Sequence, residues 1–299
     1  MKLSVALFLS SLGLAAPSES AMLPLLQPET ADKVEMVDIG GRKLRLLTRG
    51  QGAPTVVIEA GMGAAGAGDP EWRKVIEEIS KTNRVCIYDR AGLGKSDPPK
   101  KLPRTSLDLA EDLNALLAKA KVPGPYLLVA HSYGGLHARM FADRYPEQVL
   151  GMVLVDSTHP DMDRQLIDML GAPKPGEPES VAKGREFLTR RISDPNANPE
   201  KIDAKACNAQ VRALKGIGAK PAILLTHSSK FRVDGRLPEE VSLKIEEIVQ
   251  ALQIDLKKIS TNSTLKQSVN GGHGLHADDP DFVIQGIREG LEAVKKQAK

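Results

Sequence analysis

The sequence predicts an α/β protein in which a mostly parallel, eight-stranded sheet carries helices on both faces and a small helical lid. Short apolar runs alternate along the chain with amphipathic stretches of helical spacing, which is typical of strands joined by crossover helices. This rhythm breaks only in the polar stretch 157–218. With 299 residues, the chain is long enough to bury a sizeable core.

The first two strands are predicted to form an antiparallel hairpin at one edge of the sheet. Residues 34–39 and 42–50 are rich in strand-forming side chains, and Gly40 and Gly41 between them suit a tight turn. The six later strands are short apolar runs, as expected for buried parallel strands. They are 54–61, 84–89, 126–131, 151–156, 221–227 and 263–269.

Helices are predicted where apolar residues recur at helical spacing. The clearest is 106–122, with Thr105 or Ser106 as its N-cap. The other core helices are expected at 70–81, 135–149, 238–260 and 280–296. Helical fragments around 180–192 and 204–216 predict the lid. The core is therefore assigned to 34–157 and 219–299, and the lid to 158–218.

The N-terminus has the pattern of an export signal. Lys2 precedes the apolar stretch 3–16, which is short for a membrane span of about 20 residues. Small residues around Ala16, Ser18 and Ser20 offer cleavage sites. We predict a signal peptide at 1–20, a secreted or periplasmic mature protein, and no stable membrane anchor after cleavage. An uncleaved anchor is the alternative reading.

Composition excludes several classes of function. A net charge of +3 argues against a nucleic-acid partner, and 3 % aromatic residues argue against an aromatic binding platform. The two cysteines, Cys86 and Cys207, are too few for a disulfide framework and lack metal-ligand spacing. Cys86 lies in an apolar run and is expected to pack as a small hydrophobic side chain. The sequence does not decide whether the two are bridged.

The strongest chemical signal is the segment 130–135, AHSYGG. A predicted strand ends, Ser132 follows, and a predicted helix begins at once. Small residues two positions to either side permit so sharp a turn, which would project the serine Oγ at the helix N-terminus. The Tyr133 N–H would then face a developing oxyanion. Ser132 is therefore a candidate nucleophile, against the alternative of an ordinary serine in a β–α turn.

Together with this segment, four further motifs resemble the α/β-hydrolase fold family, especially its serine esterase/lipase-like or aminopeptidase-like branch. They occur in the family's order and cover 34–299, most weakly in 157–218. They are EAGMG at 59–63, YDRAGLGKSD at 88–97, LVD at 154–156 and GH at 272–273.

The resemblance implies roles for the partners of Ser132. His273 matches the family's general base and satisfies the order serine, acid, histidine, with His276 as its competitor. The acid is expected to be Asp156, at the end of the sixth strand. Asp234, after the seventh strand where the family usually keeps its acid, is the alternative.

The resemblance also implies an oxyanion hole formed by the backbone N–H groups of Met62 and Tyr133. Ala60 stands where the family often has a histidine that stabilises this loop. This departure from the family pattern concerns the geometry of the loop more than the chemistry. Asp89 and Arg90 are expected to be structural, as in the family. The run GMGAAGAG at 61–68 is not followed by the Lys-Ser/Thr of a phosphate-binding loop.

These observations predict a serine hydrolase that cleaves a small-molecule carboxylic ester through an acyl-enzyme and needs no metal or organic cofactor. The alternatives are an aminopeptidase or amidase on the same triad, or a non-catalytic protein of this fold that binds a small ligand. A lyase or perhydrolase on the same triad has the same sequence pattern. A serine nucleophile argues against epoxide opening or halide displacement, for which relatives use aspartate.

Overall fold

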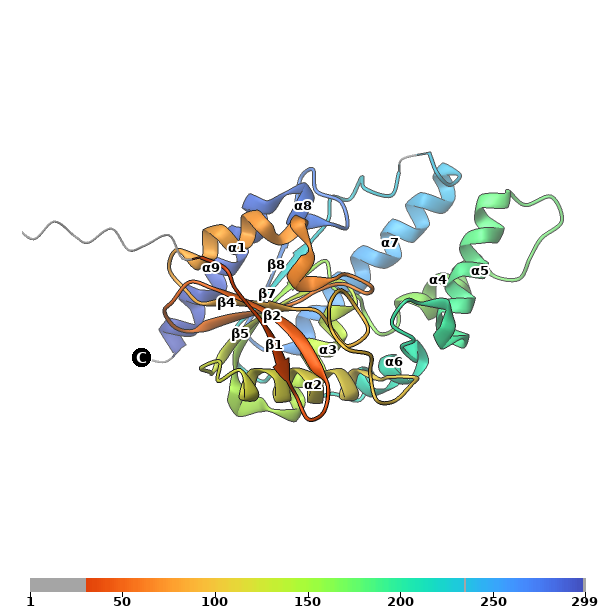
Figure 1. Cartoon of the computed structure of the whole chain (residues 1–299). Helices are drawn as coiled ribbons and strands as arrows, with labels where there is room; N and C mark the ends of the chain where they lie inside the picture. The colour runs from red at the N-terminus through yellow and green to blue at the C-terminus, as the bar shows by residue number, and fades with distance from the viewer. Residues whose placement is uncertain (1–30, 234, 298–299) are drawn as a thin grey trace, which may run out of the picture.

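A computed structural model of the chain describes residues 31–233 and 235–297 (Figure 1). The predicted signal peptide at 1–20 and the alternative acid Asp234 lie outside the described residues. Among the described helices, none has both the length and the apolar content that a membrane span requires.

The described chain forms one eight-stranded sheet, and all eight predicted strands are confirmed. In the order β1-β2-β4-β3-β5-β6-β7-β8, β2 pairs antiparallel with both β1 and β4, and every later pair is parallel. The predicted hairpin therefore forms one edge of the sheet. The strands are β1 Lys33–Asp38, β2 Lys43–Arg49, β3 Thr55–Glu59, β4 Val85–Tyr88, β5 Tyr126–His131, β6 Val149–Val155, β7 Ala222–Thr226 and β8 Ser263–Gln267.

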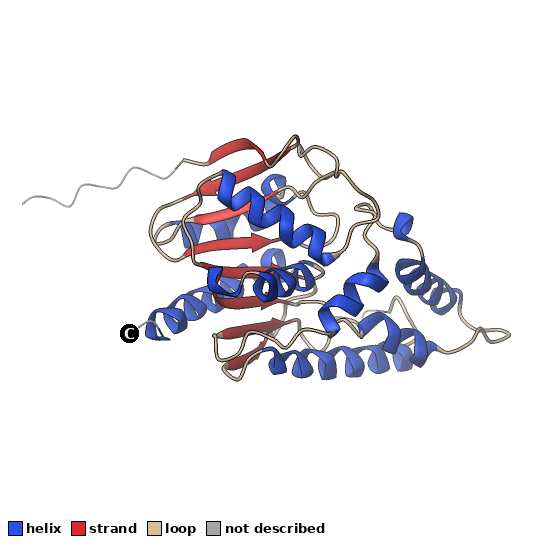
Figure 2. Ribbon diagram, turned by 90° about the horizontal axis from the view of Figure 1, so that it is seen from below, coloured by secondary structure: helices blue, strands red, loops and turns tan. Residues whose placement is uncertain are grey.

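Helices cover both faces of the sheet (Figure 2). On β5, Leu128 and Ala130 pack with α2 (Ser106–Lys119) and α3 (Gly134–Arg144). The intervening Leu127 and Val129 pack with α1 (Arg73–Ser80) and α9 (Pro280–Gln297). This alternation is the two-residue period of a strand buried on both faces.

The predicted helix 135–149 is wrong in its last third, residues 145–149. α3 ends at Arg144, a short 3-10 turn covers Pro146–Gln148, and β6 begins at Val149. Pro146 lacks the backbone N–H that a continuing α-helix would use, so the helix stops before it. β6 therefore begins two residues before its predicted start at 151.

The segment predicted as a lid contains three helices rather than two. α5 (Glu179–Ser193) and α6 (Ala204–Arg212) match the predicted fragments, whereas α4 (Met162–Leu170) was not predicted. Leu166 and Leu170 of α4 form a separate apolar cluster with α5 and with α7 (Glu239–Asp255). Figure 1 shows α4 and α5 beside the outer half of α7, away from the hairpin edge of the sheet. The lid function of 158–218 stays a prediction.

Candidate active site

Ser132 lies at the sharp turn between β5 and α3. Its φ angle of 52° is left-handed, a strained conformation for a residue other than glycine. The turn is held by the Ser132 N–H, which donates to the Val155 carbonyl at 3.1 Å, and by the Thr158 N–H, which donates to the Ser132 carbonyl at 2.9 Å. The backbone thus stabilises the strained residue from the neighbouring strand.

Two glycines after Ser132 are required by close packing. A Cβ on Gly134 would lie 2.4 Å from the Ala60 carbonyl oxygen, and one on Gly135 would lie 1.7 Å from the Ser157 Oγ. Both distances are far inside van der Waals contact. The small residues that marked this segment in the sequence therefore let α3 begin against the neighbouring loops.

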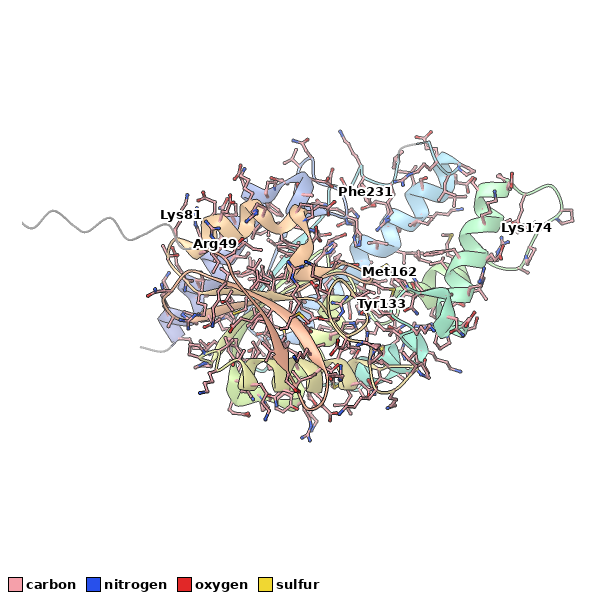
Figure 3. All side chains as sticks on the ribbon, viewed as in Figure 1. Arg49, Lys81, Tyr133, Met162, Lys174 and Phe231 are labelled. Carbon is pink, nitrogen blue, oxygen red and sulfur yellow. The ribbon has the colours of Figure 1, made fainter. Side chains whose placement is uncertain are left out.

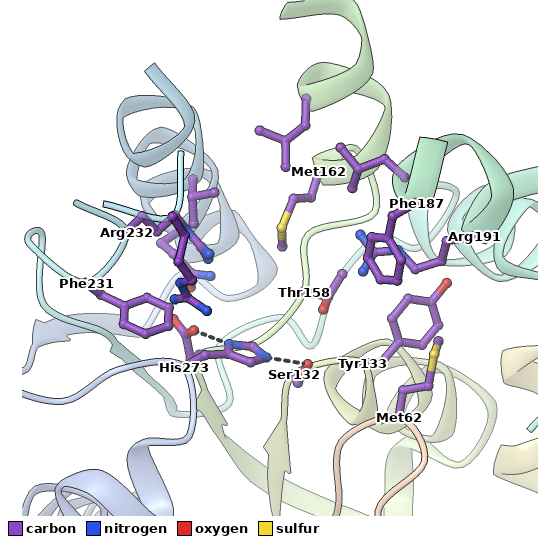
Figure 4. A pocket seen from close by; sticks show the side chains of 16 residues that line it. Met62, Ser132, Tyr133, Thr158, Met162, Phe187, Arg191, Phe231, Arg232 and His273 are labelled. Carbon is purple, nitrogen blue, oxygen red and sulfur yellow. Dashed lines mark hydrogen bonds and ion pairs between the residues drawn. The ribbon is translucent and has the colours of Figure 1, made fainter. Parts of the chain in front are cut away.

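A continuous hydrogen-bonded chain begins at Ser132. The His273 Nε2 lies 2.9 Å from the Ser132 Oγ, and the His273 Nδ1 lies 2.5 Å from the Asp156 Oδ2 (Figure 4). The Asp156 side chain is 2 % exposed, whereas that of His273 is 42 % exposed. The structure thus brings a hydroxyl, an imidazole and a buried carboxylate together in one line, with the imidazole open to solvent.

Asp156 is firmly placed at the end of β6. Its backbone N–H donates to the Leu225 carbonyl at 2.7 Å, and its φ angle is 42°. Burial would raise the pKa of this carboxyl, but hydrogen bonds from His227 and His273 outweigh burial and hold the pKa well below its usual range. Asp156 is therefore ionised beside His273.

His276, the competitor for His273, does not face Ser132. Its ring stacks on Trp72 at 4.3 Å, and its Nε2 lies 3.4 Å from a Glu71 carboxylate oxygen. The residue is 3 % exposed, and burial lowers its pKa to about 4. It packs behind the site as a neutral ring.

Met62 and Tyr133 line the same cavity as Ser132. Within 31–233 and 235–297, no group accepts a hydrogen bond from the backbone N–H of either residue. The loop of Met62 approaches the elbow closely, since a Cβ on Gly61 would lie 2.9 Å from the His131 Nδ1 and 3.5 Å from the Ser132 Cβ. Within the described chain, both residues therefore border the cavity with backbone N–H groups that have no acceptor, and the oxyanion hole stays a prediction.

This loop is held by a group that we call the oxyanion-side cluster, namely Glu59, Arg90 and Glu200. Arg90, 2 % exposed, donates to the carbonyls of Ala60 at 2.7 Å and Gly61 at 2.6 Å. It also donates twice to Glu200, at 2.8 and 2.7 Å, and once to Glu59, at 2.8 Å. Arg90 thus stabilises the loop that lacks the family's usual histidine.

Glu200 connects the segment 158–218 to this loop. Its Oε1 accepts a hydrogen bond from the Gly63 N–H at 2.8 Å, next to Met62. Burial would raise the pKa of the Glu200 carboxyl, but Arg90 outweighs it and the pKa falls to about 2. No local sequence pattern marks this residue, and it was not predicted.

A second buried group, the acid-side cluster, consists of Asp156, His227 and Glu246. His227 is the first residue after β7, and its side chain is 0 % exposed. Its Nδ1 lies 2.6 Å from the Asp156 Oδ1, and its Nε2 lies 3.1 and 3.2 Å from the two Glu246 carboxylate oxygens. The sequence offered His227 only as one of six histidines.

A cavity of about 360 Å³ opens above Ser132 and His273. Tyr133, Met162 and Phe231, which come from three separate segments, border this region (Figure 3). Two arginines of its wall are paired with carboxylates, Arg191 with Asp163 and Arg232 with Glu246 at 3.5 Å. Its apolar lining is Met62, Met162, Leu166, Phe187, Leu188, Phe231 and Val249.

One group among the described residues has the composition of a metal site. Ligand atoms of Asp69, Glu71 and His276 lie within 4.8 Å of one another. None of the three lines the cavity above Ser132. The two cysteines are both free and buried.

The sheet topology and the sharp β5–α3 turn at Ser132 are those of the α/β-hydrolase fold, as the sequence predicted. The model of the alpha/beta hydrolase fold family matches residues 54–180. A solved thermophilic esterase from Thermogutta terrifontis superposes with a TM-score of 0.55 and 21 % identity, covering 89 % of this chain and 98 % of that one. The chain therefore has the α/β-hydrolase fold.

Curated relatives also match this chain. The uncharacterized protein YqjL of Bacillus subtilis is 27 % identical over 250 residues, which is 84 % of this chain and 88 % of that protein. A probable transporter, efuK, of Hormonema carpetanum is 36 % identical over 141 residues. That match covers 44 % of this chain but spans only 20 % of the transporter's length.

Proposed function

We propose that the protein is a serine hydrolase that cleaves a carboxylic ester through an acyl-enzyme. The observation that carries this proposal is the hydrogen-bonded chain from the Ser132 Oγ through His273 to Asp156, with distances of 2.9 and 2.5 Å. A serine hydroxyl attacks at neutral pH only when a base accepts its proton. This chain supplies the base and the carboxylate that orients it.

In the proposed acylation, the Ser132 Oγ attacks the ester carbonyl carbon while the His273 Nε2 accepts the hydroxyl proton. Asp156 holds the His273 Nδ1–H and stabilises the imidazolium. The N–H groups of Met62 and Tyr133 donate to the oxyanion, and the N-terminal end of α3 adds a favourable field. When the intermediate collapses, His273 returns the proton to the departing alkoxide.

Deacylation uses the same groups in the reverse order. A water molecule attacks the acyl carbonyl, His273 accepts its proton, and the proton then passes to the Ser132 Oγ as the acid leaves. Apart from the water molecule and the substrate, the groups used in both steps belong to the chain itself.

The cavity lining favours an apolar acyl group of modest size. The volume of about 360 Å³ is at the low end for small-molecule sites, which are roughly 300–1,000 Å³. Six of the sixteen lining residues are Met, Leu or Phe, and Tyr133 and Val249 add further apolar surface. We propose a small-molecule ester as the substrate, acted on outside the cytoplasm if the predicted signal peptide is used.

The proposal is tested with p-nitrophenyl esters from acetate to decanoate, with aminoacyl p-nitroanilides for comparison. We expect ester turnover, and a loss of at least about 10³-fold in kcat for Ser132→Ala. Ser193→Ala, which changes an exposed serine on α5, is the matched control and should retain full activity. Equal turnover by Ser132→Ala would refute the mechanism. If the anilides are turned over faster than the esters, the proposed activity is that of an aminopeptidase and not of an esterase.

A further inference from the structure

Among the described residues, His227 is the one buried histidine with a carboxylate oxygen within hydrogen-bond distance of both ring nitrogens. Its Nδ1 faces Asp156 at 2.6 Å, and its Nε2 faces Glu246 at 3.1 Å. A neutral imidazole has one N–H, so it could donate to only one of them. Both contacts are hydrogen bonds to ionised carboxylates only when the ring carries both protons.

We propose that His227 is a positioning residue of the active site, a buried imidazolium that fixes Asp156 from behind and has Glu246 as its counter-ion. This inference rests on the proposed function, because it assigns a second partner to the proposed catalytic acid. His227 is not itself a base for Ser132. Its side chain is 0 % exposed, and its Nε2 is engaged by Glu246 on α7.

The contacts of Asp156 divide its two oxygens between the two histidines. The Oδ2 receives His273 at 2.5 Å. The Oδ1 receives the His227 Nδ1 at 2.6 Å, together with longer contacts of 3.3 Å from the His227 N–H and the Thr226 Oγ. The carboxylate therefore cannot rotate away from His273. This fixed orientation keeps the His273 Nδ1 protonated and leaves its Nε2 free for the serine proton.

Charged groups of alternating sign follow one another around His227. Glu246 contacts both His227 and Arg232, and the Arg232 Nε lies 3.5 Å from the Glu246 Oε2. Gln250 donates a hydrogen bond to the Glu246 Oε1 at 2.6 Å. The Phe231 and His227 rings pack edge to face, with 5.3 Å between their centroids. Gln267 donates a hydrogen bond to the His227 backbone carbonyl at 3.3 Å. Burial would lower the pKa of His227, but hydrogen bonds to Asp156 and Glu246 outweigh it and raise the pKa to about 9.

This arrangement has a consequence for the pH dependence of catalysis. Beyond Asp156, His273 is neighboured by the buried rings of His131 and His276, whose pKa values are lowered by burial to about 3 and about 4, so both are neutral at pH 7. An imidazolium at His227 offsets part of the negative charge that Asp156 presents to His273. This offset weakens the attraction between Asp156 and a positively charged His273, and the acid limb of the kcat/KM profile is the observable that reports it.

The proton count is tested without any substrate, by ¹⁵N NMR of histidine-labelled protein between pH 6 and 8. We expect the His227 signals, assigned by their disappearance in His227→Gln, to show two protonated ring nitrogens throughout. If His227→Gln does not fold, the change on Glu246→Gln makes the assignment. A ring with one protonated nitrogen at pH 7 would overturn the proposal. Since this readout needs no turnover, it stands whether or not the protein is an esterase.

The role in catalysis is tested by the pH profile of kcat/KM. Glu246→Gln keeps the packing and lets a neutral His227 still donate to Asp156, so kcat at pH 8 should fall less than about 10-fold. The acid limb should rise by about 0.5–1 pH unit as the cation is lost. Glu240→Gln, on the same helix but in an exposed pair with Lys244, should not move it. If the acid limb of the kcat/KM profile lies at the same pH in Glu246→Gln and in the control Glu240→Gln, then His227 has only a structural role.

Discussion

The two buried clusters beside Ser132 use the same charge pattern for different purposes. Each places one cation between two carboxylates, Arg90 between Glu59 and Glu200, and His227 between Asp156 and Glu246. Arg90 has five N–H donors, so after binding two carboxylates it still holds two backbone carbonyls. His227 has two side-chain donors, and both are used on carboxylates. The oxyanion-side cluster therefore fixes backbone, and the acid-side cluster fixes one carboxylate.

The two cations also differ in whether they titrate. A guanidinium stays charged at every pH at which the protein is folded, whereas an imidazolium can lose its proton near neutrality. The oxyanion-side cluster should therefore respond to pH through its carboxylates, and the acid-side cluster through its cation. The experiments below separate the two clusters by effect size and by the direction of their pH dependence.

The largest effect is expected for Asp156→Asn, which keeps the size of the side chain but removes the charge that holds His273. We expect kcat to fall about 10⁴-fold, as when a triad histidine takes the wrong tautomer. Steady-state kinetics with the preferred ester measure the loss. Asp168→Asn, at an exposed position on α4, is the matched control. A loss of less than 10-fold would remove Asp156 from the mechanism.

The next effect is on stability, for Arg90→Met. This change leaves Glu59 buried without a cation and leaves Glu200 with only the longer contact to Arg104 at 3.4 Å. The free energy of unfolding should therefore fall by about 3–5 kcal/mol. Urea titration measures this difference. Adding Glu59→Gln and Glu200→Gln to the same chain should restore part of the loss, because neutral amides cost less to bury than unpaired charges. No loss in the single variant would mean that the ion pairs do not stabilise the loop.

Glu200→Gln is expected to reveal the pH response of the oxyanion-side cluster. In the folded protein the pKa of Glu200 is lowered from its ordinary 4.5 to about 2. A lowered pKa stabilises the fold above 4.5, and this contribution is lost as pH falls toward 2. The stability gap between wild type and variant, at most about 3 kcal/mol, should therefore close on acidification. A gap that is constant from pH 5 to 2.5 would contradict the assignment.

His227→Gln should show the opposite direction. The pKa of His227 is raised from its ordinary 6.5 to about 9, so its contribution is present below 6.5 and disappears as pH rises through 9. The stability gap to wild type, expected to be about 1–2 kcal/mol at pH 6, should close by pH 9.5. Urea titrations at both pH values measure it. If the two gaps close in the same direction, the contrast between the clusters is wrong.

The sequence predicted the parts of the molecule that depend on local pattern. Strand runs, the hairpin glycines and the small residues around Ser132 are each set by neighbours in the chain. His273 and Asp156 were predicted from the resemblance to the α/β-hydrolase family, because each follows a predicted strand at a position where members of that family keep the base or the acid. Their catalytic roles stay predictions, but the structure brings them together at Ser132.

The residues that were missed depend on contacts across the fold. Glu200 meets Arg90 across 110 positions of the chain, and His227 meets Asp156 across 71. An isolated glutamate in a polar segment looks like a surface residue, and a histidine after a strand does not show which carboxylates it will face. α4 was missed for a related reason, since its apolar residues are buried only by α5 and α7.

The central claim is that Ser132 is an activated nucleophile, and covalent labelling tests it most directly. The purified protein is treated with a fluorophosphonate and digested, and the labelled peptide is identified by mass spectrometry, with Ser132→Ala and Ser193→Ala as paired variants. We expect one adduct per chain, on Ser132, that is lost in Ser132→Ala and retained in Ser193→Ala. A folded, monodisperse protein that takes no label would contradict the account and favour a ligand-binding protein of this fold.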